Sequence, residues 1–184
     1  MAEEFLDVYN KNGGLIGKET KKEAHKQGLW HHSVHIWVYN SKGQVLIQKR
    51  SKDKDSYPSL WDISAAGHVS AGETIKGAAQ REIYEELKLK IKGPELKDIG
   101  KDKVSNSIPN LNWYNNEFEN IFLFKFDGNI KKFKLKKDET ECIELISLEK
   151  FEKDVNNKQI LKKYVPHKGR YYKYIIKKIK EELK

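Results

Sequence analysis

Hydrophobic and polar residues alternate along several short stretches of the chain, and this two-residue period is typical of β-strands. The alternation, together with β-branched and aromatic residues, predicts strands over residues 5–9, 32–39, 44–50, 62–66, 96–99, 120–126 and 142–146. Residues 40–43 read Asn-Ser-Lys-Gly, a turn sequence between two of these stretches. Residues 32–50 are therefore predicted to form a β-hairpin.

Other stretches carry apolar residues at helical spacing. They predict helices over residues 74–87, 148–155 and 171–183 and a helical turn over 21–26. Predicted strands lie on both sides of the central helix in sequence, so the expected class is α/β or α+β with a mixed central sheet. No repeat or Pro/Ser-rich linker divides the chain. We expect one domain over residues 1–184, with a basic helical extension from about residue 148.

Composition narrows the class of protein. The 184 residues include 38% hydrophobic residues, the mean hydropathy is −0.81, and no run approaches the roughly 18 consecutive apolar residues of a membrane-spanning helix. The first ten residues lack the apolar segment of a signal peptide. A single cysteine, Cys142, excludes an internal disulfide and a cysteine cluster for zinc. We expect a cytoplasmic protein without a membrane partner.

The net charge of +9 is concentrated near the C-terminus. Residues 131–184 hold 17 Lys and Arg against 9 Asp and Glu, whereas residues 1–130 are almost neutral. This third of the chain could attract nucleic acid. Because no recognisable nucleic-acid module accompanies the charge, a solvated lysine face on amphipathic elements is the favoured interpretation. A homodimer is compatible with the sequence.

Residues 67–89 carry the chemistry that is easiest to interpret. On the predicted helix, three acidic residues fall within an arc of about 100° that meets the edge of the apolar stripe, so they are expected where the helix meets the sheet. Carboxylates at this spacing repel one another, and a hard divalent cation such as Mg²⁺ or Mn²⁺ would relieve the repulsion. Arg81 can pair with one acid. The three acids are Glu82, Glu85 and Glu86.

Glutamates on a helix face are also common without any metal. Residues 181–184 repeat the tetrapeptide of residues 85–88, Glu-Glu-Leu-Lys, and no glycine loop precedes them. The acids alone are therefore weak evidence, and their surroundings decide the interpretation.

Those surroundings follow a fixed spacing. Gly67, five residues, Glu73, seven residues and then Arg81-Glu82-Ile83-x-Glu85-Glu86 match the pattern G-x5-E-x7-R-E-U-x-E-E-x-G-U, in which U is a bulky aliphatic residue. In this the sequence resembles the Nudix hydrolases. Lys88 stands where the pattern has its second glycine, at a position where helices often end in a left-handed residue.

The resemblance implies a Nudix fold, an α/β/α sandwich, and hydrolysis of a nucleoside diphosphate linked to another group. It implies that Glu82, Glu85 and Glu86 bind Mg²⁺ or Mn²⁺, with the Gly67 carbonyl as a further ligand, and that Arg81 and Glu73 hold the loop. Attack by water also needs a carboxylate that removes a proton. Glu86 is one candidate, and the others are Glu117, Glu119, Glu139 and Glu141.

Residues 4–90 resemble one Nudix branch in particular, that of isopentenyl diphosphate isomerase. In these isomerases a cysteine precedes the glycine of the motif, and here that position is Ala66. Cys142 lies far away in a predicted strand. The complete set of motif acids is typical of hydrolases, so hydrolysis is favoured. The alternatives are an isomerase-like activity and a non-catalytic nucleotide- or RNA-binding module.

The histidines have two interpretations. His25, His31 or His32, and His68 could form a second metal site or contact the diphosphate. In the alternative interpretation, His32 and His35 lie on one face of a strand as ordinary sheet residues, and the others lie in surface loops. Further candidates for substrate binding are Lys49 and Arg50, which could contact phosphate, and Trp113 and Tyr114, which could stack on a base. Trp61 is expected in the core.

Overall fold

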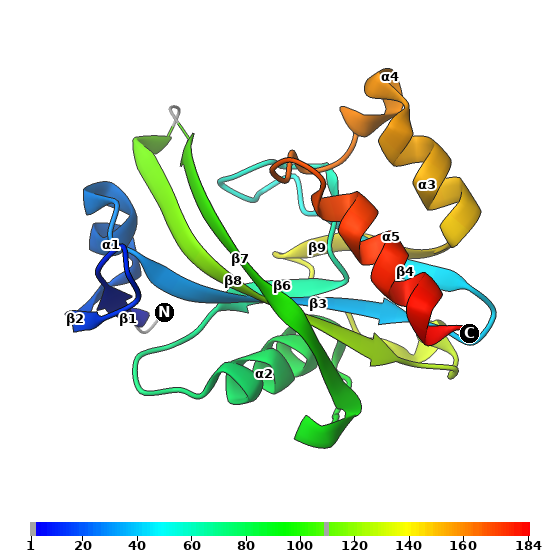
Figure 1. The fold of residues 1–184 in the computed structure, drawn as a ribbon, viewed down its shortest axis with the longest axis horizontal. Coiled ribbons are helices and arrows are strands. Elements are labelled where there is room, and N and C mark those ends of the chain that lie inside the picture. Colours follow the sequence, from blue (N-terminus) through cyan, green and yellow to red (C-terminus); the bar gives the residue numbers. More distant parts are fainter. Residues whose placement is uncertain (1–2, 109–110) are drawn as a thin grey trace.

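The computed structural model describes residues 3–108 and 111–184. Its strands are β1 (Phe5–Tyr9), β2 (Leu15–Thr20), β3 (His31–Tyr39), β4 (Gln44–Arg50), β5 (Trp61–Asp62), β6 (Ala65–His68), β7 (Leu96–Ile108), β8 (Trp113–Lys125) and β9 (Thr140–Ser147). Its helices are α1 (Lys21–Gln27), α2 (Ile75–Leu87), α3 (Leu148–Asn156), α4 (Lys158–Leu161) and α5 (Tyr171–Glu182). A mixed sheet lies between α2 on one side and α3 and α5 on the other (Figure 1). The expected α/β/α sandwich is confirmed.

Strand β3 is the centre of the sheet, and its pairing differs from the predicted hairpin. It pairs in parallel with β8 along its whole length, and its other edge pairs with β6 over residues 33–36. The turn at residues 40–43 forms, but β3 and β4 share only the register pair Tyr39–Val45 and then diverge. The Ser64 hydroxyl lies between the two strands, where it accepts from Val38 N (2.8 Å) and donates to Leu46 O (2.5 Å). The predicted strand over 62–66 is accordingly two short strands, β5 and β6.

The antiparallel pair β7–β8 is much longer than the predicted strands at 96–99 and 120–126. The added residues are mostly polar, so they lack the hydrophobic alternation on which the prediction rested. Strand β2 was missed for the same reason, since it is exposed along most of its length. Trp113 and Tyr114, which belong to a polar stretch of the sequence, begin β8.

Two hydrophobic cores hold the layers together. On one face of the sheet, Ala78, Ala79, Ile83 and Leu87 of α2 pack against Val34 and its neighbours. On the other face, Phe151 of α3 and the isoleucines of α5 pack around Trp37. The C-terminal helices thus bury apolar side chains against the sheet and expose their lysines. No helix in the described part of the chain is both long and apolar enough to cross a membrane.

The ends of α2 are set by local chemistry. The Thr74 hydroxyl accepts from Gly77 N at 3.1 Å and caps the start of the helix. Lys88 ends it with φ 54° and ψ 29°. This is the left-handed conformation for which the Nudix pattern has glycine, so the lysine adopts it at a cost in backbone strain.

Candidate functional site

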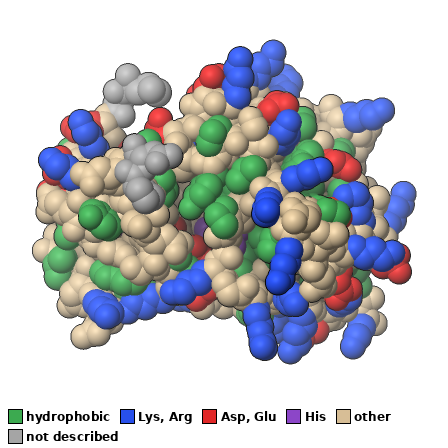
Figure 2. Space-filling model, turned by 90° about the horizontal axis from the view of Figure 1, so that it is seen from above, with side chains coloured by type: hydrophobic (Ala, Val, Ile, Leu, Met, Phe, Trp, Pro, Cys, Tyr) green, Lys and Arg blue, Asp and Glu red, His purple; other side chains and the backbone are tan. Residues whose placement is uncertain are grey.

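One cleft of about 850 Å³ brings most of the predicted site residues together. Carboxylates of α2, histidines of α1, β3 and β6, and acids of β8 line it, and residues 165–167 close one side. In Figure 2 histidine and acidic side chains are visible at the bottom of a hollow near the centre of the face shown. The separation of β3 from β4 allows α2 to present its acids to the cleft beside β6.

The three motif acids differ in burial. Glu86 is 5% and Glu82 8% exposed, whereas the side chain of Glu85 is 41% exposed. Glu86 accepts hydrogen bonds from Gln48 Nε2 at 2.8 Å and from Ala66 N at 3.3 Å. Burial and the nearby Glu82 charge raise the pKa of Glu86 to about 8, and burial raises the pKa of Glu82 to about 7.

Glycine is required at position 67 by the acid that faces it. A Cβ atom at this position would lie 2.1 Å from Glu82 Oε1 and 2.2 Å from its Cδ. Strand β6 can therefore pass close to the carboxylate only without a side chain.

Arg81 and Glu73 form the contact expected from the motif. Arg81 Nε and Nη2 donate to the two carboxylate oxygens of Glu73 at 3.0 and 2.9 Å, and Nη2 also donates to the His68 carbonyl. Arg81 Nη1 lies 2.6 Å from Glu82 Oε1. The guanidinium thereby joins the loop to the helix and orients one of the three acids.

The acids of α2 fit a hard divalent cation. Two carboxylates are buried on one helical turn, and their raised pKa values indicate that their charge is undercompensated. Gly67 lies directly beside Glu82, as expected if its carbonyl were a further ligand. Among the residues that the structure describes, Arg81 is the one cationic side chain that contacts these acids.

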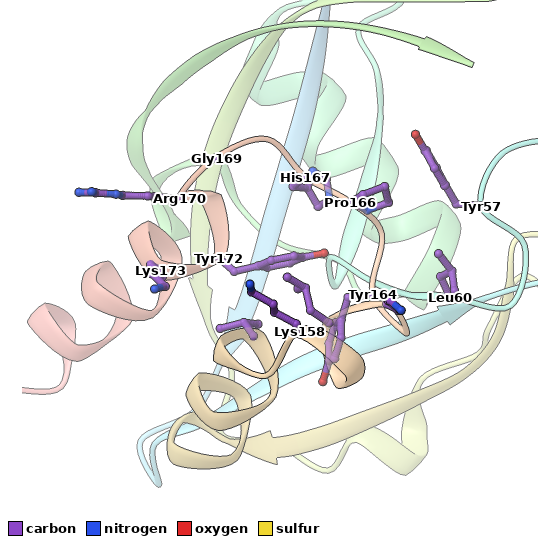
Figure 3. A pocket seen from close by; sticks show the side chains of 13 residues that line it. Tyr57, Leu60, Lys158, Tyr164, Pro166, His167, Gly169, Arg170, Tyr172 and Lys173 are labelled. Atoms are coloured by element: carbon purple, nitrogen blue, oxygen red, sulfur yellow. The ribbon is translucent and has the colours of Figure 1, made fainter. Parts of the chain in front are cut away.

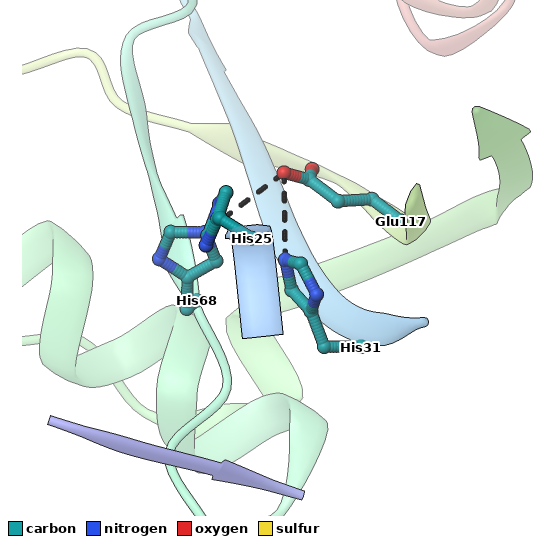
Figure 4. Close-up of side chains that lie close together, drawn as sticks. All are labelled: His25, His31, His68 and Glu117. Carbon is teal, nitrogen blue, oxygen red and sulfur yellow. Dashed lines mark ion pairs between the residues drawn. The ribbon is translucent and has the colours of Figure 1, made fainter. Parts of the chain in front are cut away.

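A second group of potential metal ligands lies at the same cleft, which three of its four members line. His25, His31, His68 and Glu117 each offer an atom within 4.8 Å of the others (Figure 4). Nε2 of His31 and of His68 lie 3.7 and 3.8 Å from Glu117 Oε1. Burial opposes the charge of Glu117, but the surrounding imidazoles lower the pKa of its carboxyl below the usual range.

Two of these imidazoles are oriented by backbone carbonyls. Nδ1 of His25 donates to Lys21 O at 2.8 Å, and Nδ1 of His31 donates to Leu29 O at 2.9 Å. Because a carbonyl only accepts, Nε2 of each neutral ring carries the lone pair. Nε2 of His31 is buried and has no hydrogen-bond partner among the residues described. The group thus also fits a metal ion.

His32 is not part of this group. It lies on the opposite face of β3, against Tyr9 and Phe118. The expectation that His32 and His35 share a face is wrong, because side chains alternate along a strand. Ser33 and His35 line the cleft, and His31 lies on their side of the strand beside His68 and Glu117.

The remaining predicted residues divide between the cleft and the outer surface. Arg50 and Trp113 line the cleft, and the Trp113 ring lies 4.7 Å from that of His25. Lys49 pairs with Glu141 at 2.9 Å, and neither lines the cleft. Tyr114 is 49% exposed and lies outside it as well.

Trp61 packs against the core beside α3 and α5. Of the candidate bases, Glu86, Glu117, Glu119 and Glu139 line the cleft.

Asp62 and His167 in the cleft were missed from the sequence, and His35 was interpreted only as an ordinary sheet residue. Asp62 accepts from Arg50 Nη1 at 3.0 Å and from His167 Nε2 at 3.1 Å. Burial alone would raise the pKa of Asp62, but His167 and Arg50 lower it to about 2. His35 also lines the cleft, with its ring 5.6 Å from that of His167. Burial lowers the pKa of His35 to about 4. No motif marks these positions, because they come from three distant parts of the chain.

A separate cavity of about 540 Å³ adjoins the cleft at residues 166–167 (Figure 3). The rings of Tyr57, Tyr164 and Tyr172 and several aliphatic side chains line it. The hydroxyls of Tyr164 and Tyr172 donate to Asp154 and to Val165 O, respectively. Four basic residues and no acidic residue belong to its lining, namely Lys158, Lys162, Arg170 and Lys173.

Comparison with known proteins agrees with the motif. Residues 29–167 match the family model described as NUDIX domain. An uncharacterised Nudix hydrolase of Clostridium acetobutylicum is 32% identical over 99% of this chain and all of its own length. An isopentenyl-diphosphate Delta-isomerase of Serratia proteamaculans is 31% identical over 68% of each chain. The crystal structure of protein DR0079 from Deinococcus radiodurans superposes with a TM-score of 0.65 at 21% identity, covering 95% of this chain and 98% of that one.

Proposed function

Because the chain belongs to the Nudix hydrolase family, we propose that it cleaves a diphosphate linkage in a nucleoside diphosphate derivative or a similar small diphosphate compound. The observation that carries this proposal is the complete set of motif acids, two of them buried, at the edge of a cleft large enough for such a substrate.

The cation that fits the acids is Mg²⁺ or Mn²⁺, held by Glu82, Glu85 and Glu86 with the Gly67 carbonyl. When bound, such an ion neutralises phosphate charge and lowers the pKa of a water molecule. Arg81 positions Glu82 through its contacts with Glu73 and with the β6 backbone. The histidine group with Glu117 is a candidate for a further divalent ion of the kind that prefers imidazole.

Proton removal from the attacking water needs a carboxylate within hydrogen-bond reach of that water. Glu86 lines the cleft and is our candidate for the general base, through an oxygen that the cation does not bind. Gln48 holds one of its oxygens, which fixes the orientation of the other. Glu139 and the β8 acids Glu117 and Glu119 are the alternatives within the cleft.

Isomerisation of a prenyl diphosphate is the second candidate, because isomerases are among the relatives. The cleft favours hydrolysis. Ala66 provides no thiol, and Cys142 on β9 lies outside the cleft. The lining includes His35, Asp62 and Glu119, polar groups that offer an apolar tail no hydrophobic surface.

We further propose that the adjoining 540 Å³ cavity accommodates the group attached to the diphosphate. Tyrosine faces suit a planar ring, and the four basic residues suit further negative charge on the same compound. A single-stranded RNA ligand is a weaker candidate, since the deep part of the cleft is rich in carboxylates.

The test is incubation of the purified protein with nucleoside diphosphate conjugates, free nucleotides and isopentenyl diphosphate, each with Mg²⁺ or Mn²⁺. We expect phosphorus-31 NMR to show conversion of a diphosphate to monophosphates. A shifted double bond in the prenyl compound, without released phosphate, would identify an isomerase and contradict the proposal.

A further inference from the structure

The cleft contains another group of potential ligands, next to the one that includes Glu117. His35 of β3, Glu119 of β8 and His167 of the loop before α5 each offer one atom within 4.8 Å of the others. Strands β3 and β8 run parallel with Ser33 opposite Glu119, so both strands direct alternate side chains to the same side. All three residues line the cleft on the side closed by residues 165–167.

Both imidazoles are fixed in orientation. His167 Nε2 donates to Asp62 Oδ1 at 3.1 Å, and Arg50 holds the other oxygen of Asp62. Since the carboxylate only accepts, the lone pair of a neutral His167 ring is at Nδ1. His35 Nδ1 lies 2.7 Å from the Tyr171 hydroxyl, and the His167 ring stacks on the Tyr171 ring at 4.5 Å. Histidines that bind metal are commonly held in this way at their other nitrogen. The nitrogen left for a metal ion is therefore Nδ1 of His167 and Nε2 of His35.

The third member has an unsatisfied oxygen. Glu119 is 5% exposed, and its Oε2 has no hydrogen-bond partner within residues 3–108 and 111–184. The hydroxyl of Ser33, the register partner of Glu119, is likewise buried without a partner in that part of the chain. Leaving such atoms unpaired costs free energy, and a cation would recover it.

We propose that His35, Glu119 and His167 bind a divalent transition-metal ion, separate from the ion on the α2 carboxylates and from the group around Glu117. Two imidazole nitrogens and one carboxylate oxygen favour Zn²⁺, Co²⁺ or Mn²⁺ over Mg²⁺ or Ca²⁺. Asp62 is a positioning residue, because it contacts His167 and not the ion. The inference concerns metal binding alone and does not depend on the proposed hydrolysis.

The experiment measures zinc binding to the full chain after treatment with a chelator. Isothermal titration calorimetry gives affinities, and elemental analysis after gel filtration gives ions per chain. His167→Phe retains a ring against Tyr171 and removes both nitrogens, and Glu119→Gln retains the shape and removes the charge. His32→Phe is the matched control, since His32 lies on the other face of β3. Circular dichroism and Tm establish that each variant is folded.

We expect His167→Phe and Glu119→Gln each to bind one zinc ion fewer than the unmodified protein, and His32→Phe to bind the same number. Asp62→Asn should retain the ion with an affinity reduced about 10–100-fold. An unchanged count in His167→Phe would overturn the proposal. Loss in Glu119→Gln without loss in His167→Phe would also overturn it, because Glu119 would then belong to the neighbouring group around Glu117.

Discussion

The carboxylate of Glu82 occupies the space that a side chain at position 67 would need. A Cβ atom there would lie 2.1 Å from Glu82 Oε1, less than any van der Waals contact allows. Gly67→Ala should displace either the acid or strand β6, and a displacement of about 1 Å in such a site costs about 100-fold in kcat/KM. Steady-state kinetics with the substrate found in the panel measure this effect.

Gly93→Ala is the control for that change. Gly93 has no positive φ, and its nearest heavy atom to an added Cβ is Gln80 Oε1 at 3.8 Å. We expect activity and Tm close to those of the unmodified protein. Equal activity of Gly67→Ala and Gly93→Ala would show that the position of Glu82 is unimportant for turnover.

Removal of charge from the buried acids should abolish most activity. Glu82→Gln and Glu86→Gln keep the size of each side chain and eliminate a negative charge, so we expect kcat/KM to fall at least about 100-fold while circular dichroism stays unchanged. Glu181→Gln is the matched control, because Glu181 is an exposed residue of α5 in the second copy of the Glu-Glu-Leu-Lys tetrapeptide. A similar small effect in all three variants would remove the α2 acids from the mechanism.

The stability of the metal-free protein should fall as pH rises from 7 to 9. Burial raises the pKa of Glu82 to about 7 and the pKa values of Glu86 and Glu119 to about 8. Over this range the folded chain binds more protons than the unfolded chain, in which these groups are already ionised, so the free energy of unfolding decreases with pH. The total loss should be on the order of a few kcal/mol.

Urea denaturation at several pH values, with a chelator and with Mg²⁺, measures this dependence. Glu86→Gln cannot ionise at this position and should show a smaller decrease. Saturating Mg²⁺ should also reduce it, because the cation stabilises the ionised carboxylates. A free energy of unfolding that rises between pH 7 and 9 in the metal-free protein would contradict the assigned directions of the pKa shifts.

Lys88→Gly should stabilise the protein. The lysine has φ 54°, which glycine adopts without steric strain. Its Nζ also lies 5.1 Å from the centre of the Tyr84 ring, and Lys88→Ala removes this contact while keeping the strain. We expect Lys88→Gly to exceed Lys88→Ala by about 1 kcal/mol in the free energy of unfolding. Equal stability of the two variants would show that the backbone at position 88 is unstrained.

The basic rim of the 540 Å³ cavity should affect substrate binding. For a substrate with an additional anionic group, Lys158→Glu combined with Lys173→Glu should raise KM about 10-fold or more and leave kcat nearly unchanged, since these residues are remote from the α2 acids. Lys177→Glu on the same helix, outside the lining, is the control. An unchanged KM in the double variant would exclude the cavity as the place of that group.

The sequence predicts those parts of the site whose residues lie close together along the chain. Glu82 and Glu86 were predicted to lie at the edge of the apolar stripe of α2, and the structure places both at the edge of the cleft, close to the sheet. The lysine at the glycine position of the motif left the end of α2 open, and the structure ends the helix there with a left-handed Lys88. These positions follow from helical periodicity and from the fixed spacing of the motif, which spans only about twenty residues.

The remainder depends on pairing between distant strands. Parallel registration of β3 with β8 places His31 beside Glu117 and Ser33 beside Glu119, although more than 80 residues separate them. His167 is held in the cleft by its hydrogen bond to Asp62 and by stacking on Tyr171, and no pattern in the neighbouring sequence distinguishes it from other histidines. The divergence of β3 from β4 was also unpredictable, because the buried Ser64 that lies between them resembles any serine in a loop.

The parallel pairing of β3 with β8 has a consequence for biosynthesis. A nascent chain that has emerged to residue 90 already contains the whole motif, but the neighbour along one edge of its central strand has not yet been made. That edge offers unpaired backbone groups to any other chain until residue 125 is available. The incomplete chain on the ribosome is therefore prone to aggregation while about thirty-five further residues are added. At ordinary elongation rates this takes a few seconds. Chaperone demand during expression should concentrate in that interval.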